Sequence, residues 1–488
     1  MTTKVSLRRQ LNTFDATSLV VGSAIGADIF VIPSLTAKLL GPASIIVWLF
    51  GAFVAIVIAL CFAYCATYYP RVGGSYAYAK EVAGPFPGFM VGWAMLLAEW
   101  FTLAVYPVAF TQYFAVMVPQ IGPVGQLVLK AVFIVIIILT NIYGVKLAGK
   151  FNDLLTLLKL GPLFLLICLG AAFILLKPSI ALPHFQPFFV GNTSGAGQAL
   201  VLIFWAYAGF ELSSLPADEI QQPRKTLPKA LFIGMLIVSA FYIITNLVVI
   251  GILDQQSLAS STAPLSIAAQ RVLDFSPSLS LLGGLILVGG AMFSILGADE
   301  SATIGTSRLA FAMSIDGMLP RVFSRLERSY RTPYVSIIIL CSTALIASVT
   351  NSLSALINSS VFLLSFAYLA TSISAMILEK RHPKKSHSYF ARLIVPILGI
   401  IFSVLLMTQV TQQQIIISLI LFAIGIPMFV FSPKEELIGL RRQFLSRDAR
   451  LERAYHQGEV YLANVIRHLQ RSIYRRRHVQ RTWKVEEN

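Results

Sequence analysis

The chain has 488 residues, of which 56% are hydrophobic and only 12% are charged. A typical soluble domain carries about 25% charged residues. The composition therefore excludes the soluble globular class and indicates an integral membrane protein. The formal net charge is +16, and its meaning depends on where the basic residues fall along the chain.

Apolar segments of bilayer-spanning length recur through most of the sequence. We predict an all-α integral membrane fold with twelve spans, at residues 17–39, 43–68, 86–117, 125–148, 153–176, 195–220, 229–253, 279–313, 333–350, 354–378, 391–410 and 413–432. The third and eighth segments are longer than a simple span, so we expect these helices to tilt or to extend into water.

Basic residues are distributed unevenly between the two sides of this predicted topology. If the N-terminus is cytoplasmic, the outer loops and their edges carry only Lys38, Lys130, Lys177 and Arg271. The inner segments carry Lys4, Arg8, Arg9, Arg71, Lys80, Lys146, Lys150, Arg224, Lys225, Lys229, Arg321, Arg325, Arg328, Arg331, Lys380, Arg381, Lys384 and Lys385. The positive-inside rule then predicts a multi-pass protein of the cell membrane with both termini cytoplasmic. The positive charge is thus a topology signal, and we expect no nucleic-acid partner.

The first predicted span is interrupted near its middle by two glycines and Asp28. Glycine weakens a helix, and a carboxylate is costly in hydrocarbon. Such a break is tolerated at membrane depth only where the backbone is buried in protein or lines a cavity. Freed amides there would bind an anion such as a substrate carboxylate, whereas the alternative is close helix packing by small residues. The predicted substrate-binding run is Gly22, Ser23, Ala24, Ile25 and Gly26.

The sixth predicted span is interrupted in the same way, and two broken spans five apart are the sequence sign of an inverted repeat with a midplane binding site. We therefore predict substrate binding here too, with ordinary core packing as the alternative. The residues concerned are Phe204, Trp205, Ala206, Ala208 and Gly209, followed by the acidic Glu211.

Ionisable side chains inside the predicted spans are expensive and therefore indicate function. Glu99 lies midway along the third span, and we assign it to the substrate site. Lys159 lies about two turns inside the fifth span, where a lysine that gains and loses a proton would hold the first and eighth spans together when charged and release the inner gate when neutral. A structural lysine paired with Asp299 or Glu300 is the alternative. With Lys159, the predicted proton-coupling set comprises Glu211, Ser301 and Thr303.

The four cysteines all fall inside predicted spans. We interpret them as buried small hydrophobic residues rather than as disulfide or metal-site residues. They are Cys61, Cys65, Cys168 and Cys341.

Short motifs stand at the ends of several spans. A turn is predicted at residues 69–78, where Pro70 is followed by Gly73-Gly74-x-Tyr76. The others are Gly92-Trp93 with Glu99 in the third span, Glu219 with Pro223 and Pro228 after the sixth, and Asp316-Gly317-x-x-Pro320 after the eighth. Together with the two breaks, these motifs resemble the amino acid-polyamine-organocation (APC) transporter superfamily over residues 12 to about 330.

This resemblance implies the LeuT-type fold, in which two inverted repeats of five helices, with helices 1 and 6 broken, are followed by two additional helices. Lys159 falls where some proton-coupled members carry a lysine whose ammonium takes the place of the sodium ion of sodium-coupled relatives. Trp205 resembles the aromatic residue that closes over substrate in arginine-exchanging members.

Asp28 departs from the pattern of the superfamily, which usually has a second small residue at this position. Its carboxylate would either cap the outer half of the first span or bind a substrate amine. In the second case it would replace the carboxylate that a decarboxylated amine lacks, which favours polyamines over amino acids.

These features predict a secondary transporter of amino acids, coupled to protons and working by alternating access. An exchanger of cationic amino acids or polyamines is the first alternative, and a membrane sensor or assembly subunit is the second. We expect membrane lipids as the surroundings, no cofactor, and no enzymatic activity, because no P-loop and no nucleophile–His–acid arrangement is evident.

The domain organisation follows from the spans. We expect a cytoplasmic N-terminus (1–16), a transport core (17–378) that holds the first ten spans, a pair of further spans (379–432) and a basic cytoplasmic tail (433–488). In the tail, the apolar spacing over residues 460–474 predicts either a basic amphipathic helix on the inner membrane surface or a plain solvated helix.

Overall fold

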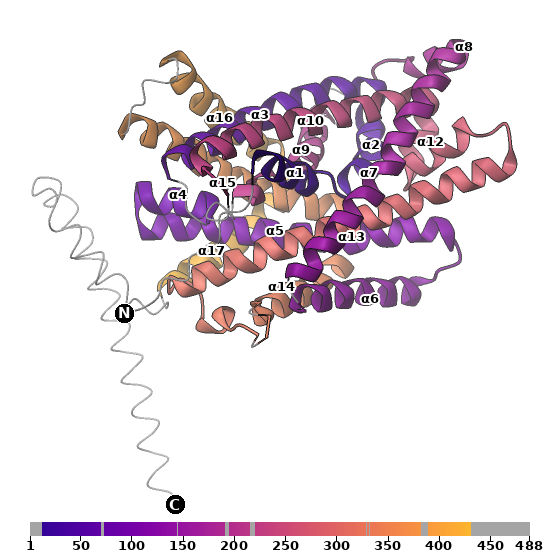
Figure 1. The fold of residues 1–488 in the computed structure, drawn as a ribbon. Helices are drawn as coiled ribbons and strands as arrows, with labels where there is room; N and C mark the ends of the chain where they lie inside the picture. The colour runs from indigo at the N-terminus through magenta and orange to yellow at the C-terminus, as the bar shows by residue number, and fades with distance from the viewer. Residues whose placement is uncertain are drawn as a thin grey trace, which may run out of the picture.

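The computed structural model describes residues 12–69, 73–143, 145–190, 195–214, 220–327, 329–330, 332–381 and 389–430. Every regular element in these ranges is a helix (Figure 1). Within them, nine helical stretches are long and apolar enough to cross a membrane, and 334–350 and 393–409 form shorter apolar helices. The predicted tail and the motif residues Pro70 and Glu219 lie outside the described residues.

The first five predicted spans correspond to six helices, because the first span is divided. They are α1 (Thr13–Ala24), α2 (Asp28–Leu40), α3 (Ser44–Tyr68), α5 (Pro85–Met117), α6 (Pro123–Ile142) and α7 (Val145–Leu176). Shorter elements join them or follow them, namely η1 (Gly41–Ala43), α4 (Gly74–Ala83), α8 (Pro178–Ala181) and η2 (Leu182–Phe185).

The remaining spans begin with α9 (Gly195–Tyr207), which is followed by the 3-10 turn η3 (Phe210–Ser214). The long helices are then α10 (Pro223–Ile252), α13 (Pro277–Ile315), α14 (Tyr334–Thr350), α15 (Leu353–Arg381), α16 (Tyr389–Gln409) and α17 (Gln412–Val430). The connections contain α11 (Gln255–Ser260), α12 (Pro264–Val272) and η5 (Arg321–Ser324).

Local sequence explains where several of these helices begin. α1 starts with a capping box, in which the Asn12 side chain accepts from the amides of Phe14 and Asp15 and the Asp15 carboxylate accepts from the Asn12 amide at 2.9 Å. Four long helices start with proline, whose fixed backbone angle suits the first helical position. These are α5, α6, α10 and α13.

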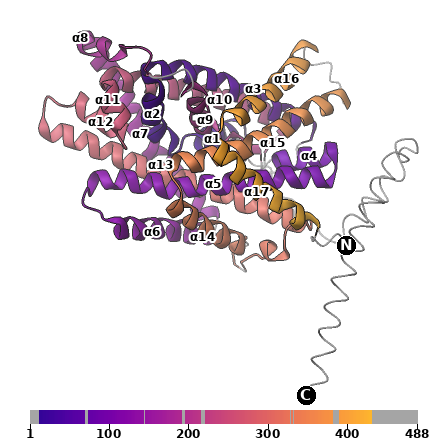
Figure 2. The same ribbon diagram turned by 180° about the vertical axis from the view of Figure 1, so that it is seen from behind.

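The breaks themselves lie in the interior of the bundle, since most residues at 24–34 and 199–207 are buried. In both views α6 and α14 lie side by side at one edge (Figures 1 and 2). Within the most apolar 18-residue stretch of each helix, 89% of the residues of α5 are buried, against 17% for α6 and 11% for α17. α5 is therefore a core helix, and α6 and α17 present apolar side chains outward, as lipid-facing helices do.

Two local predictions need correction. Cys61, Cys65 and Cys341 are buried as expected, but Cys168 is exposed, because it lies on an outward face of α7. Within the described part of the predicted turn at residues 69–78, Gly73 and Gly74 have positive φ angles of +116° and +50°. From Gly74 onward the chain forms α4, because the alanine- and tyrosine-rich run that follows the glycines supports a helix.

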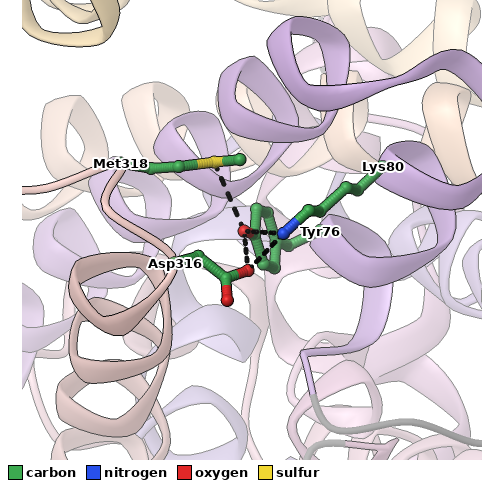
Figure 3. A network of polar contacts seen from close by, with 4 residues as sticks. All are labelled: Tyr76, Lys80, Asp316 and Met318. Atoms are coloured by element: carbon green, nitrogen blue, oxygen red, sulfur yellow. Dashed lines mark hydrogen bonds and ion pairs between the residues drawn. The ribbon is translucent and has the colours of Figure 1, made fainter. Parts of the chain in front are cut away.

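Two of the sequence motifs meet at one end of the bundle. Lys80 on α4 forms an ion pair with Asp316 at 2.6 Å, and the hydroxyl of Tyr76 donates to the same carboxylate (Figure 3). The Met318 sulfur lies 3.3 Å from that hydroxyl. The Tyr76 ring packs directly against Gly92 on α5. Any larger residue there would clash with it, because a Cβ would lie 2.9 Å from the ring. The Gly-Gly-x-Tyr and Asp-Gly motifs thus join α4 to the end of α13.

We predict that Lys80 and Asp316 stabilise the protein as a pair. Their side chains are only 22% and 28% exposed, so a double-mutant cycle of Lys80→Met and Asp316→Asn should give a coupling of about 1 kcal/mol. Thermal unfolding in detergent measures it. The matched control pair is Arg271 and Asp274, which lie 3.6 Å apart and are mostly exposed, and for which we expect no coupling. Additive losses at Lys80 and Asp316 would contradict the prediction.

Candidate functional site

The two helix breaks touch each other. Ser23, at the end of α1, donates from Oγ to the carbonyl oxygen of Gly209 at 3.0 Å. Gly209 follows α9 and has a φ of +107°, and a Cβ there would lie only 2.6 Å from the Ser23 carbonyl oxygen. Only glycine suits both the backbone angle and this close approach. Segments nearly 190 residues apart in sequence therefore form one backbone junction.

Side chains from three other helices bind the carbonyl groups that the first break exposes. Lys159 on α7 donates from Nζ to the carbonyls of Gly22 and Ile25, both at 2.8 Å. Tyr242 on α10 donates to the Ala24 carbonyl at 2.8 Å, and Ser294 on α13 donates to the Gly26 carbonyl at 3.1 Å. The break thus satisfies the rule that buried backbone groups need partners. The carbonyl groups bound in this way belong to Gly22, Ala24, Ile25 and Gly26.

Lys159 is completely enclosed, with 1% of its surface exposed. Its hydrogen bonds go to the carbonyl-rich end of α1 and not to the carboxylates that we named as an alternative. Glu300 instead accepts from Thr140 on α6 at 2.7 Å, and Asp299 accepts from Thr303 at 3.3 Å. The C-terminal carbonyls of a half-helix are a cation site, and here the ammonium group of this lysine occupies it.

Asp28 interacts with the amides on the opposite side of the break. Its Oδ1 accepts from the amides of Gly26 at 3.1 Å and Ile29 at 2.5 Å. It also lies 2.9 Å from the Tyr242 hydroxyl, whose single proton is shared between this oxygen and the Ala24 carbonyl. Donors converging on one oxygen stabilise a carboxylate. Asp28 is the first residue of α2, where its charge suits the helix dipole, and its carboxylate occupies the Gly26 amide that was predicted to bind substrate.

Two further carboxyl groups lie against each other beside the second break. Glu211 in η3 accepts the Gly209 amide on both of its oxygens at 3.0 Å. Its side chain also lies close to Glu99 on α5 and to Tyr368 on α15. Both acids are buried, with 0% and 3% exposure for Glu211 and Glu99. The structure therefore brings together two acids that the sequence places in separate spans.

Aromatic residues lie between the acidic groups. Tyr106 on α5 is within electrostatic range of four carboxyl groups, from Asp28, Glu99, Glu211 and Asp299. Its ring centroid is 6.4 Å from that of Trp205, whose indole N–H donates to Thr102 at 3.3 Å. Trp205 therefore lies beside the predicted substrate site.

The other predicted residues of the sixth span serve mainly to pack it. Phe204 is buried against Tyr368, with ring centroids 5.7 Å apart, and Ala206 is also buried. The Ala208 amide donates to the carbonyls of Phe204 and Trp205, at 3.1 Å each. These contacts end α9 and leave Gly209 to form the junction with α1.

The two predicted proton-coupling residues on α13 form hydrogen bonds with groups on α13 itself and on α14. Ser301 donates to the Gly297 carbonyl at 3.0 Å, and Thr303 lies between Asp299 and Cys341. Neither residue has a hydrogen bond to Lys159 in the part of the chain that the structure describes. Contact between α13 and the first break instead comes from Ser294, which the sequence analysis did not identify.

Sequence reasoning missed several residues of this site. A single tyrosine or serine in an apolar span is common and has no distinguishing pattern, and only the fold directs these residues to the breaks. They are Tyr106, Tyr242, Ser294 and Tyr368. Among the described residues, no group of three or more His, Cys, Asp or Glu side chains is arranged to hold a metal ion.

Comparison with known proteins agrees with this arrangement. The sequence model of the family described as "Amino acid permease" matches residues 11–432. The branched-chain amino acid permease BcaP of Bacillus subtilis is 26% identical over 88% of this chain and 94% of its own length. The methylthioribose transporter of the same organism is 27% identical over 89% of this chain and 95% of its own length. Its serine/threonine exchanger SteT is 27% identical, with 87% and 96% covered.

The match covers both broken helices, Lys159 and all the long helices through α17. Each of these relatives is named as a permease, transporter or exchanger, and none as an enzyme. With its broken helices buried in an apolar helical bundle, the chain belongs to the amino acid permease family of the APC superfamily, whose members are membrane transporters rather than enzymes.

Proposed function

We propose that this protein is a secondary active transporter that moves an amino acid or a closely related small amine by alternating access, coupled to protons. The relatives support an amino acid substrate, since their names include a branched-chain amino acid permease and a serine/threonine exchanger. The LeuT-type arrangement of two five-helix inverted repeats in a core at 17–378, with a total of twelve spans, belongs to the same proposal. So do its place in the cell membrane and its cytoplasmic termini.

The observation that carries the proposal is the pair of hydrogen bonds from Lys159 to the Gly22 and Ile25 carbonyls. In transporters with broken helices, such carbonyls coordinate the coupling cation. Lysine binds these carbonyls more strongly when it is protonated, because the neutral amine has lost its charge and one of its three donors. Loss of the proton would therefore weaken the link between α7 and α1 and allow the two helices to separate.

Glu99 and Glu211 are candidates for transferring protons beside the second break. Two buried carboxyl groups that lie close together disfavour a charge on both, so one of them tends to hold a proton and the pair suits a proton-binding role. Because Glu211 also holds the Gly209 amide, a change in its charge would act directly on the junction of the two breaks.

Uptake into proteoliposomes tests the proposal. Purified full-length protein in empty vesicles should accumulate a radiolabelled amino acid or amine when an inward proton gradient is imposed, and collapse of the gradient with an ionophore should abolish accumulation. Uptake that appears only in vesicles preloaded with substrate would replace proton coupling by obligate exchange. That is the activity named for the serine/threonine exchanger relative. No uptake under either condition would contradict transport itself and favour a sensor or assembly subunit.

A further inference from the structure

We propose that the preferred substrate is an amine without an α-carboxylate, and that Asp28 supplies the missing carboxylate from the protein. The inference rests on the proposed transport function and specifies its substrate class. It is based on Asp28 in the first break, whose carboxylate accepts hydrogen bonds from backbone amides.

The first step concerns the amides. At the N-terminus of a half-helix, backbone N–H groups normally bind the anionic group of the substrate. In this protein the amides of Gly26 and Ile29 both donate to Oδ1 of Asp28, with the Tyr242 hydroxyl as a third donor. A substrate carboxylate directed to these amides would have to displace Asp28 and would then lie beside a like charge. An amine has no such group and meets no such obstacle.

The second step concerns the other oxygen of Asp28. No hydrogen bond to Oδ2 is found among the described residues, whereas Oδ1 has three. A Cβ on Gly26 would lie 3.7 Å from Oδ2, 3.9 Å from the Tyr106 ring and 2.8 Å from the Ala298 Cβ, so this oxygen lies where Gly26, Tyr106 and Ala298 pack closely. The side chain keeps 5% exposure. Oδ2 thus has lone pairs with no donor among the described residues, and in the proposed site they accept from the substrate ammonium.

The third step concerns the charge around that place. Asp28, Glu99, Glu211 and Asp299 all lie within electrostatic range of the Tyr106 hydroxyl. The cation nearest to them is Lys159, whose hydrogen bonds go to the α1 carbonyls. Acidic side chains therefore outnumber basic ones here. A buried cluster of acids favours a ligand that brings a positive charge over one that carries its own carboxylate.

Pairs of compounds that differ only in the α-carboxylate test this inference. The probes are cadaverine with lysine, putrescine with ornithine, agmatine with arginine, and isoamylamine with leucine. Binding to the full-length protein in detergent is measured by ligand-dependent thermal stabilisation, which needs no transport and no gradient. We expect at least one amine to bind at least about tenfold more tightly than its amino acid.

Variants of Asp28 then identify the cause. Asp28→Gly and Asp28→Ser remove the carboxylate and free the two amides, so the preference should move toward the amino acid by at least about tenfold. Asp28→Asn keeps the size and the acceptor oxygen but loses the charge, and it should weaken amine binding even if the smaller replacements fail to fold. The matched control is Asp274→Asn, an exposed acid outside the site, which should leave the ratio unchanged.

The outcomes separate this inference from the transport proposal. Tighter binding of the amino acid in every pair, no binding of any amine, or an equal change for both members of a pair in the Asp28 variants would overturn the inference. An amine that binds with the expected preference but never enters proteoliposomes would instead contradict transport and leave the binding site as inferred. If amino acids are transported and bind more tightly than the corresponding amines, the inference about Asp28 is overturned and the transport proposal is supported.

Discussion

Replacement of Lys159 by alanine is expected to lower gradient-driven uptake by at least about a hundredfold. The change removes two charge-assisted hydrogen bonds and leaves the Gly22 and Ile25 carbonyls without their partner in a buried site. Each such bond contributes about 1.5–3 kcal/mol, and every 1.4 kcal/mol is about a tenfold change in an equilibrium. The measurement is uptake per folded protein in proteoliposomes with an inward proton gradient.

Lys159→Arg separates the role of the charge from the role of the proton. Arginine keeps a permanent positive charge, so it can bind the α1 carbonyls but cannot release a proton. We expect proton-driven accumulation to be lost while exchange between preloaded substrate and external substrate persists. The matched control is Lys130→Ala, which removes a lysine whose Nζ donates to the Ser348 carbonyl at 2.8 Å, away from the breaks. Wild-type accumulation by Lys159→Ala would rule out coupling through this lysine.

Replacement of Gly209 by alanine should have the second large effect. The residue has a φ of +107°, and the new Cβ would lie 2.6 Å from the Ser23 carbonyl oxygen and 3.0 Å from its carbon. Backbone atoms cannot move aside as a flexible side chain does, so the two breaks must separate. Strain at such a position costs about 1–3 kcal/mol before the steric clash is added. We expect a marked drop in thermal stability and loss of substrate binding.

Gly289→Ala is the matched control for this variant. Gly289 lies within α13, and a Cβ there would meet no atom within 4 Å. Alanine favours a helix over glycine by about 1 kcal/mol, so the control should be neutral or slightly stabilising. Equal stability of Gly209→Ala and Gly289→Ala in detergent unfolding would show that the junction between the breaks is not as tight as its backbone geometry indicates.

The sequence was sufficient for those features that depend on local chemistry. Apolar length identified the spanning segments, and glycines with a carboxylate marked the break between α1 and α2, because these residues are unfavourable in a membrane helix wherever it packs. The spans predicted at 86–117 and 279–313 begin within two residues of α5 and α13. For the same reason Lys159 and Glu99 could be identified as functional candidates before their partners were known.

The tertiary structure decided which groups meet. A sequence does not reveal that the partners of Lys159 are backbone carbonyls of α1 instead of Asp299 or Glu300, because every backbone carbonyl looks alike in a sequence. Tyr242 and Ser294 are ordinary residues of apolar spans until the fold directs them to the first break.

The faces of the helices were also decided only by packing. In a soluble protein, polar residues mark the outer face of a helix, but in a membrane both the lipid and the protein interior are apolar. Hydrophobicity therefore could not show that Cys168 is exposed while Cys61 is buried. The sequence alone determined that the chain spans a membrane with two broken helices. The fold decided that the breaks touch and that Asp28 occupies the amides of the first, because these contacts join residues from different helices.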